Sequence, residues 1–243
     1  MIEVLALDKF QVLIDSIEHG SEAGTVESVL GRLCSMFDLQ NAVYLGVNIP
    51  QSRSSGIFVA TTYRKEWKDH YLAQRYDRID PVVQTGLRRI TPLDWAELDR
   101  SPPKMRQFFG EAEEFGVGGQ GLSFPIRGIH GELGLFSVNT DCSATEWESL
   151  KAHNTRDLQS LAFYLHTFVL KSLGVSNHPQ PKLSQREVEC LTWAAAGKTE
   201  WATAEILNLS IKTVRFHLEN AKVKLNCVTK TQAVAKSIRL SMI

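Results

Sequence analysis

The stretch Ser210-Ile-Lys-Thr-Val-Arg-Phe-His-Leu-Glu-Asn-Ala-Lys-Val-Lys-Leu225 decides the architecture of the C-terminal part of this chain of 243 residues. With a period of 3.6 residues, its apolar side chains fall on one face of a helix: Ile211, Val214, Leu218, Ala221 and Leu225. Lys, Arg, Thr, Phe, Glu and Asn side chains fall elsewhere, and Ser210 can accept from the free N–H groups of the first turn. The pattern predicts a helix with a buried inner face and a basic, polar outer face.

Further short helices are predicted on both sides of this stretch. Ser184-Gln-Arg-Glu187 is a capping box that opens one helix, and Gly197 suits the position just beyond its end. A second helix spans roughly Glu200–Leu207, and a second capping box, Thr229-Lys-Thr-Gln232, opens the last helix. Together with the tight connection at residues 208–210, these helices predict an all-α helix-turn-helix domain over residues 182–243.

Charge divides the chain in the same place. The whole chain has 27 basic and 27 acidic side chains, but residues 171–243 have eleven Lys or Arg against five Asp or Glu. Residues 1–170 carry the remaining 16 basic and 22 acidic side chains. A basic end on an acidic body favours a nucleic-acid surface, because cations pair with phosphates and Arg or Asn can read bases. The alternatives are chance asymmetry and a merely solvated helix face.

Before residue 174 the pattern is mixed. Amphipathic helices are predicted near Leu7–Ile17, over Val26–Phe37 and over Trp147–Phe168, and four strands between them: Ala42–Ile49, Ile57–Thr62, Leu122–Ile126 and Leu133–Asn139. Residues 174–181 are polar, contain Pro179 and Pro181, and are predicted to be a linker. The expected fold class is α+β, with an α/β/α sandwich on an antiparallel sheet over residues 1–173 and the all-α domain after the linker.

Several function classes have no support in the sequence. The four Cys have neither paired nor metal-type spacing, the seven His are dispersed, and no catalytic residue, metal or cofactor is expected. Gly116-Val-Gly-Gly-Gln-Gly121 matches a dinucleotide motif literally, but it follows a helical stretch and precedes a strand, so we interpret it as a turn. No signal peptide and no membrane span are apparent, which predicts a cytoplasmic protein without a membrane partner.

One cluster of aromatic residues in the first domain is a candidate binding site. Tyr63, Trp67 and Tyr71 recur at i, i+4 and i+8, which predicts one face of a helix, and Tyr76, Asp80 and Trp95 follow. Ordinary core packing is the alternative, but buried Tyr and Trp need polar partners and a buried Asp is costly unless it is paired. Aromatic walls with one carboxylate suit a neutral ligand that bears an amide.

Taken together, these motifs resemble the LuxR-type quorum-sensing regulators that respond to acyl-homoserine lactones. In the first half the resemblance rests on the Tyr63/Trp67/Tyr71 run, Asp80-Pro81-Val82, Trp95, Gly116 and Gly131-Glu-Leu-Gly134. In the second half it rests on Glu187, Leu191, Gly197-Lys198-Thr199, Thr213-Val214, His217 and Lys224-Leu225. The family usually has Pro where this chain has Arg64, and Glu-Ile where Ala202-Thr203 stand; Trp201 is a candidate to replace the buried area of that Ile.

The resemblance implies a set of contacts. Trp67 would donate to the lactone carbonyl, Asp80 would accept from the amide N–H, and Tyr63 would donate to the acyl carbonyl. The implied ligand-binding residues are Tyr63, Trp67, Tyr71, Asp80, Val82, Trp95 and Ser137. The implied DNA-binding residues are Thr199, Ser210, Lys212, Thr213, Arg215, Phe216, His217, Asn220 and Lys224.

The expected function is therefore a ligand-responsive regulator of transcription, an activator that binds an N-acyl-homoserine lactone and, as a homodimer, an inverted-repeat promoter site, with RNA polymerase as a further partner. Two alternatives stay open: a signal-binding protein that acts by pairing with another regulator, and a small hydrolase with a DNA-binding domain. The sequence leaves open the acyl length and oxidation, the operator, and whether the signal promotes or releases DNA binding.

Overall fold

A computed structural model describes residues 11–15, 17, 24–49, 56–129, 131–175 and 181–243. Apart from residues 129–131, a first compact unit runs to residue 177 and a second one starts at residue 178, and each is described by itself. Of the predicted N-terminal helix, Ile14 and Ile17 are helical and buried, whereas Leu7 and Phe10 lie outside the described residues. Among the described helices, none combines the length and apolar composition that a bilayer crossing requires.

The first unit is built on a five-stranded antiparallel sheet of strand order β2-β1-β5-β4-β3. Its strands are β1 (Asn41–Val47), β2 (Phe58–Thr61), β3 (Leu93–Asp94), β4 (Gln120–Arg127) and β5 (Leu133–Thr140). The four predicted strands are all present. The sequence missed β3, which has two residues and is held by pairing of Leu93 with Ser123 and of Asp94 with Leu122.

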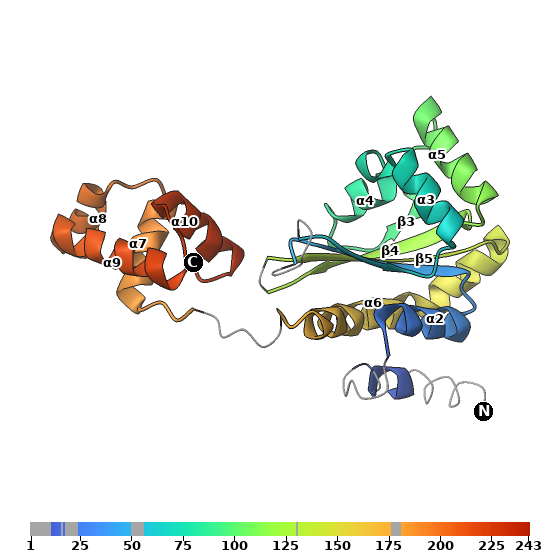
Figure 1. Ribbon diagram of the computed structural model, residues 1–243, viewed down its shortest axis with the longest axis horizontal. Helices are drawn as coiled ribbons and strands as arrows, with labels where there is room; N and C mark the ends of the chain where they lie inside the picture. The colour runs from blue at the N-terminus through green and yellow to red at the C-terminus, as the bar shows by residue number, and fades with distance from the viewer. Residues whose placement is uncertain (1–10, 16, 18–23, 50–55, 130, 176–180) are drawn as a thin grey trace. The chain divides into compact units, whose positions relative to one another are not determined.

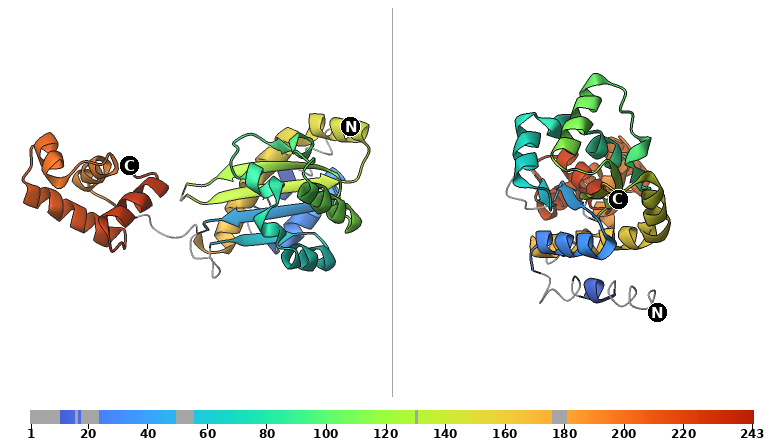
Figure 2. Two further views of the ribbon diagram at one scale, coloured as in Figure 1. Left: turned by 90° about the horizontal axis from the view of Figure 1, so that it is seen from above. Right: turned by 90° about the vertical axis from the view of Figure 1, so that its right-hand side faces the viewer.

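Helices cover both faces of the sheet, as expected for an α/β/α sandwich (Figure 1). One cover consists of α2 (Val26–Phe37) and α6 (Ala144–Ser172). The other consists of α3 (Lys65–Ala73), α4 (Pro81–Gly86) and α5 (Pro103–Glu114), with 3-10 turns η1 (Tyr76–Arg78) and η2 (Trp95–Glu97) between them. The right-hand view of Figure 2 shows the two covers on opposite sides of the strands.

The strand register assigns each side chain to a face, because successive residues of a strand point to opposite sides. The face toward α2 and α6, called the apolar face below, carries Ala42, Tyr44, Phe124, Ile126, Phe136 and Val138. The opposite face, called the cavity face, carries Asn41, Val43, Ser123, Leu135, Ser137 and Asn139. One polar group breaks the pattern of the apolar face, since Tyr44 Oη lies 2.6 Å from His166 Nδ1 of α6.

The second unit is all-α. Its helices are α7 (Gln185–Ala195), α8 (Glu200–Leu207), α9 (Ile211–Lys224) and α10 (Lys230–Arg239). Its core consists of Cys190, Leu191, Ala204, Val214, Leu218, Ala221, Leu225 and Ala233. The helix-turn-helix domain is thus confirmed, with a complete capping box at Ser184 and Glu187 and a cap at Ser210.

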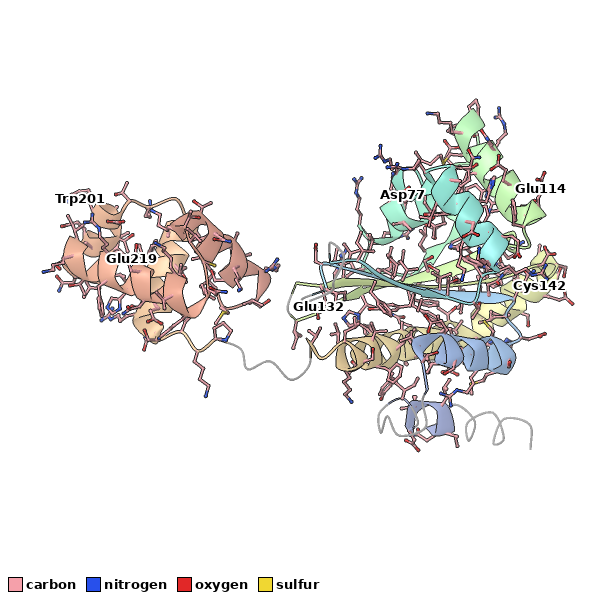
Figure 3. The ribbon with its side chains drawn as sticks, in the orientation of Figure 1. Asp77, Glu114, Glu132, Cys142, Trp201 and Glu219 are labelled. Atoms are coloured by element: carbon pink, nitrogen blue, oxygen red, sulfur yellow. The ribbon has the colours of Figure 1, made fainter. Side chains whose placement is uncertain are left out.

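Three expectations about the second unit were wrong. Ile211, placed on the inner face of α9, is 42% exposed because it stands in the first turn, outside the contact with α7 and α8. Trp201 is 63% exposed and replaces no buried area (Figure 3). The box at Thr229 is incomplete, since Gln232 Oε1 accepts from the Val228 N–H and leaves Thr229 as a simple cap.

Candidate functional site

A small, partly open cavity of about 80 Å³ lies between the cavity face of the sheet and the cover formed by α3, α4 and α5. All seven ligand-binding residues expected from the sequence line it: Tyr63, Trp67, Tyr71, Asp80, Val82, Trp95 and Ser137. Further lining residues are Val43, Val83, Phe108, Phe109, Ala112, Glu113, Val117, Gly118 and Gly119. The structure therefore brings together residues that are spread over 95 positions of the chain.

The aromatic run does not share one helix, contrary to the expectation. Helix α3 begins at Lys65, so Tyr63 precedes it, and Arg64 occupies the N-cap position in an extended conformation. Trp67 is buried and meets Tyr71 edge-on at 5.8 Å between ring centroids. Its indole N–H makes no hydrogen bond within the described part of the chain, so this donor is available to a ligand.

Asp80 is buried, but it is well paired. Its Oδ1 accepts from the N–H groups of Val82 at 2.8 Å and Val83 at 3.2 Å, so it caps α4, and Pro81 suits the first helical position. Its Oδ2 accepts from Tyr71 Oη at 2.9 Å. Burial raises the pKa of the Asp80 carboxyl in spite of these three hydrogen bonds, which lower it. The sequence analysis expected a buried charge that is costly unless it is paired; the helix cap and Tyr71 supply that pairing.

Two hydrogen-bonded groups form the polar floor of the cavity. Asn139 Nδ2 donates to Tyr63 Oη at 2.8 Å, and burial raises the pKa of that phenol. Beside it, Trp95 Nε1 donates to Ser123 Oγ at 2.9 Å, and Ser123 Oγ lies 2.8 Å from Ser137 Oγ. Trp95 rests directly on the β4 backbone, because a Cβ at Gly121 would lie 2.3 Å from its ring.

A polar cluster ties the roof helix α5 to its neighbours. Glu111 accepts from Tyr76 Oη and from Gln107 Nε2, and its Oε2 lies 2.6 Å from His70 Nε2. These hydrogen bonds hold the pKa of Glu111 at about 2, His70 being the largest cause. His70 also stacks on Phe115 at 4.8 Å. The roof of the cavity thus depends on groups that titrate.

The sequence analysis missed the contribution of α5 to the cavity, which consists of Phe108, Phe109 and Ala112. An apolar stripe on a helix is the usual sign of a core, so the residue types gave no separate signal. The turn at residues 116–119 was expected, and it does follow α5 and precede β4. Gly118 is required there, since a Cβ would lie 2.2 Å from the Thr140 carbonyl oxygen.

A larger, open cleft of about 620 Å³ lies where α2 ends and α6 begins, lined by Asp38, Asp141, Cys142 and His153 among others. Its polar groups are largely engaged locally: Glu146 caps α6 and His153 Nδ1 lies 2.7 Å from the Ser149 carbonyl. The small cavity is the better candidate, because it is less open than this cleft and is lined by aromatic side chains with a few polar groups.

The outer face of α9 is the candidate nucleic-acid surface of the second unit. Lys212, Arg215 and Phe216 are exposed there, whereas His217 and Asn220 are half-buried. Arg215 is held by Glu200 of α8, with Nε 3.0 Å from the carboxylate. Glu219, labelled in Figure 3, pairs with Lys222 at 2.8 Å.

The remaining candidates of this surface also have partners inside the domain. The Ser210 hydroxyl accepts from the Thr213 N–H and lies 2.7 Å from the Thr213 hydroxyl, and Thr199 caps α8. Lys224 donates to buried Glu187 at 2.8 Å and so joins α9 to α7. For Lys224 this contact is a structural role, which the sequence pattern did not distinguish from a contact with phosphate.

Comparison with protein families divides the chain in the same way. Residues 22–169 match the autoinducer binding domain family. Residues 181–237 match a family described as bacterial regulatory proteins, luxR family. The first match contains every lining residue of the cavity, and the second contains α7 to α9 and most of α10.

Comparison with individual proteins gives similar regulators. The chain is 35% identical to the transcriptional activator protein RaiR of Rhizobium etli over 172 residues, which cover 70% of this chain and 71% of that protein. It is 32% identical to the transcriptional activator protein VanR of Vibrio anguillarum, with 78% of each chain covered. The solved structure of SdiA in complex with octanoyl-rac-glycerol has a similar fold, with a TM-score of 0.67 at 22% identity over 96% of this chain and 95% of that one.

Proposed function

The chain belongs to the LuxR family of quorum-sensing transcription regulators, with an autoinducer-binding domain and a helix-turn-helix DNA-binding domain, and from this we propose that it is an activator whose signal is an N-acyl-homoserine lactone. The observation that carries the signal class is the buried carboxylate of Asp80 in the wall of a cavity that hydroxyl and indole donors also line. We propose the domain limits 1–173 and 182–243, joined by the linker 174–181.

The polar groups of the cavity complement an acylated amide. Asp80 Oδ2 accepts one hydrogen bond and, as a carboxylate oxygen, can take another from a ligand N–H. Trp67 Nε1, the Tyr63 hydroxyl and the Ser137 hydroxyl are donors that suit carbonyl oxygens of a ligand. A ligand with one N–H and two carbonyl groups, set on an apolar chain, satisfies these groups. Tyr71, Val82, Trp95 and the phenylalanines of α5 would surround the chain.

The size of the cavity implies movement. Pockets that enclose small molecules have volumes of ~300–1,000 Å³, and this one has about 80 Å³. A lactone can therefore enter only if the cover moves away from the sheet. Since a ligand that binds the folded domain alone stabilises it by mass action, signal at a hundred times its dissociation constant would add about 2.7 kcal/mol.

The test of the signal class is a ligand panel. The purified full chain is melted with N-acyl-homoserine lactones of increasing acyl length, with and without a 3-oxo group, and with octanoylglycerol, the type of ligand bound to SdiA. We expect the lactones to raise the melting temperature more than the acylglycerol, which offers Asp80 only the hydroxyl groups of a flexible glycerol in place of an amide N–H beside the acyl carbonyl. The opposite order would assign the cavity to an acyl ester, and mass spectrometry of the recovered lactone would reveal any hydrolysis.

For the second domain we propose binding of an inverted-repeat promoter site by a homodimer, since two recognition helices reach half-sites about one helical turn apart. Thr199, Ser210, Lys212, Thr213, Arg215, Phe216, His217 and Asn220 are the proposed contacts; Lys224 is the weakest candidate because Glu187 engages it. RNA polymerase is the further partner that activation requires, and the protein acts in the cytoplasm.

Substitutions on α9 test this surface. A phosphate contact weakens binding to all sequences alike and lowers the salt slope by about one unit, whereas a base contact costs ~1–3 kcal/mol at one position. We expect the first behaviour for Lys212→Ala and the second for Arg215→Ala. Arg186→Ala, which removes an exposed Arg paired with Glu189 on α7, is the matched control. If no inverted repeat is shifted by the parent protein, pairing with another regulator becomes the better proposal.

A further inference from the structure

Asn139 is fully buried on β5, two residues after Ser137 and on the same face of the sheet. It is absent from the cavity lining described above and stands behind Tyr63. Its side chain makes three hydrogen bonds. Oδ1 accepts from Asn41 Nδ2 at 3.0 Å and from the Gly118 N–H at 3.2 Å, and Nδ2 donates to Tyr63 Oη at 2.8 Å.

The orientation of this amide follows from its backbone partner. An Asn side chain can be turned over without changing its shape, so its partners must assign oxygen and nitrogen. The Gly118 N–H can only donate, so the atom that faces it is the oxygen. The other terminal atom is therefore the NH₂ group, and it faces the Tyr63 hydroxyl.

This contact determines the hydrogen-bonding role of the Tyr63 hydroxyl. Its oxygen accepts from Asn139, and within the described part of the chain no group accepts the phenol proton. Buried hydroxyl groups without an acceptor are rare. Tyr63 lines the cavity, so the unused proton is available to an acceptor placed there.

We infer that Asn139 is a positioning residue that makes the Tyr63 hydroxyl a hydrogen-bond donor, and so sets the preference of the cavity for a ligand with an acyl oxygen. The inference rests on the proposed signal class. It predicts that reversing the hydrogen bond behind Tyr63 changes which ligands bind, beyond any effect on folding.

Asn139→Asp makes this reversal at almost constant shape. Its Oδ1 keeps the partners Asn41 and Gly118, and its second oxygen replaces the donor that faced Tyr63. Tyr63 would then donate backward and present only lone pairs to the cavity. Asn139→Ala is the companion variant, because it removes all three hydrogen bonds and leaves the Tyr63 hydroxyl free to turn.

The measurement compares two ligands in the purified full chain: the tightest lactone of the panel and its thioamide analogue. The thiocarbonyl sulfur is a poorer acceptor, while the N–H is kept for Asp80. We expect the parent to prefer the oxygen ligand by about three- to tenfold, the worth of one neutral hydrogen bond. The preference should fall partly in Asn139→Ala and to within about twofold in Asn139→Asp.

A purely structural role predicts the reverse order, since the Ala variant loses more hydrogen bonds and would be the worse of the two. Adding Tyr63→Phe tests whether Asn139 acts through the Tyr63 hydroxyl. In a protein that carries Tyr63→Phe, Asn139→Asp should no longer alter the preference for the oxygen ligand over the thioamide. Thermal melting without ligand identifies any variant that fails to fold. If Asn139→Asp fails to fold, the Asn139→Ala variant becomes the test, and an unchanged ligand preference in it overturns the inference. A parent-like preference in a folded Asn139→Asp protein also overturns it, while leaving the signal class standing. Failure of the parent to bind any lactone overturns both.

Discussion

The two faces of the sheet in the first unit are formed by the same strands, but one packs as an apolar core and the other lines the candidate binding cavity. On β5, Phe136 and Val138 point to the apolar face and are fully buried against α2 and α6. Ser137 and Asn139 alternate with them and point to the cavity face, where both are also buried. Burial alone therefore does not separate core from site; the polarity of the buried groups does.

The covers of the two faces differ in the same way. Helices α2 and α6 are held mainly by aliphatic and aromatic contacts, with Trp147, Leu158 and Leu161 almost completely buried. Two polar contacts of α6 add to these, from His166 to Tyr44 and from Lys151 to Asp94. On the other side, Glu111 joins α5 to His70 and Tyr76 through hydrogen bonds, and Asp80 caps α4. Apolar packing depends little on pH or ligand, whereas polar contacts depend on both. The apolar face thus provides a rigid base on which the cavity cover can move.

The largest effect is expected on the apolar face. Phe136→Ala should destabilise the first unit by about 3–5 kcal/mol, because it leaves a void among fully buried side chains. Urea unfolding of the full chain, monitored through the transition of the first unit, measures this loss of unfolding free energy. Saturating signal should add the same increment of stability to parent and variant; a much larger increment in the variant would mean that the void has become part of the ligand site.

The second effect, on the cavity face, should appear mainly with ligand. Asp80→Asn keeps an oxygen that can cap α4, and Asn caps about as well as Asp, so melting without ligand should change little. Affinity for the lactone should fall by roughly ten- to a hundredfold, equivalent to ~1.4–2.8 kcal/mol, because the charged acceptor of the amide N–H is lost. If ligand raises the melting temperature of both proteins equally, Asp80 does not contact the signal.

The sequence predicted the parts of the fold that have a period. Helix α2 repeats its apolar residues at helical spacing, β5 alternates between apolar and polar residues from Phe136 to Asn139, and α8 was placed at its observed bounds. Strand β3 and helix α4 were missed, because two and six residues are too short to show a period. They form through pairing with β4 and through the cap of Asp80.

The sequence predicted those residues of the candidate site whose type is unusual for an ordinary apolar core. Polar-tipped aromatic residues and one acidic residue marked the cavity, and the family resemblance added Val82 and Ser137. Phe108 and Phe109 could not be separated from an ordinary core stripe. Asn139 and Ser123 do not line the cavity but hydrogen-bond to residues that do, Tyr63 and Ser137. The sequence could not show this, because it depends on the register of β4 and β5.

The third prediction concerns the polar clamp on α5. The pKa of Glu111 is held at about 2, below its ordinary value of about 4.3, so its contribution is complete above about pH 4.5 and is lost as the pH falls toward 2. Glu111→Gln should therefore cost roughly 1–2 kcal/mol at neutral pH, and the difference from the parent should shrink in acid. Amide hydrogen exchange locates the destabilised region: in the variant, the amides of α5 should exchange faster than those of α6. Equal protection of both helices would show that the clamp does not hold the roof.

The smallest effect is expected from Ser137→Ala, the neighbour of Phe136 that points the other way. Ser123 is fully buried and its oxygen accepts from Trp95, so its own proton finds an acceptor in Ser137 Oγ, and the Ser137 proton is left for a ligand. The variant removes that donor and should weaken lactone binding by about 0.5–1.5 kcal/mol. It also strips Ser123 of its acceptor, so stability without ligand should fall slightly. Ser137→Thr is the control, since it keeps the hydroxyl and should restore binding if its methyl group is accommodated beside Val43. Calorimetric titration of the three proteins with one lactone decides the matter: equal affinities would leave Ser137 as part of the sheet and not of the site.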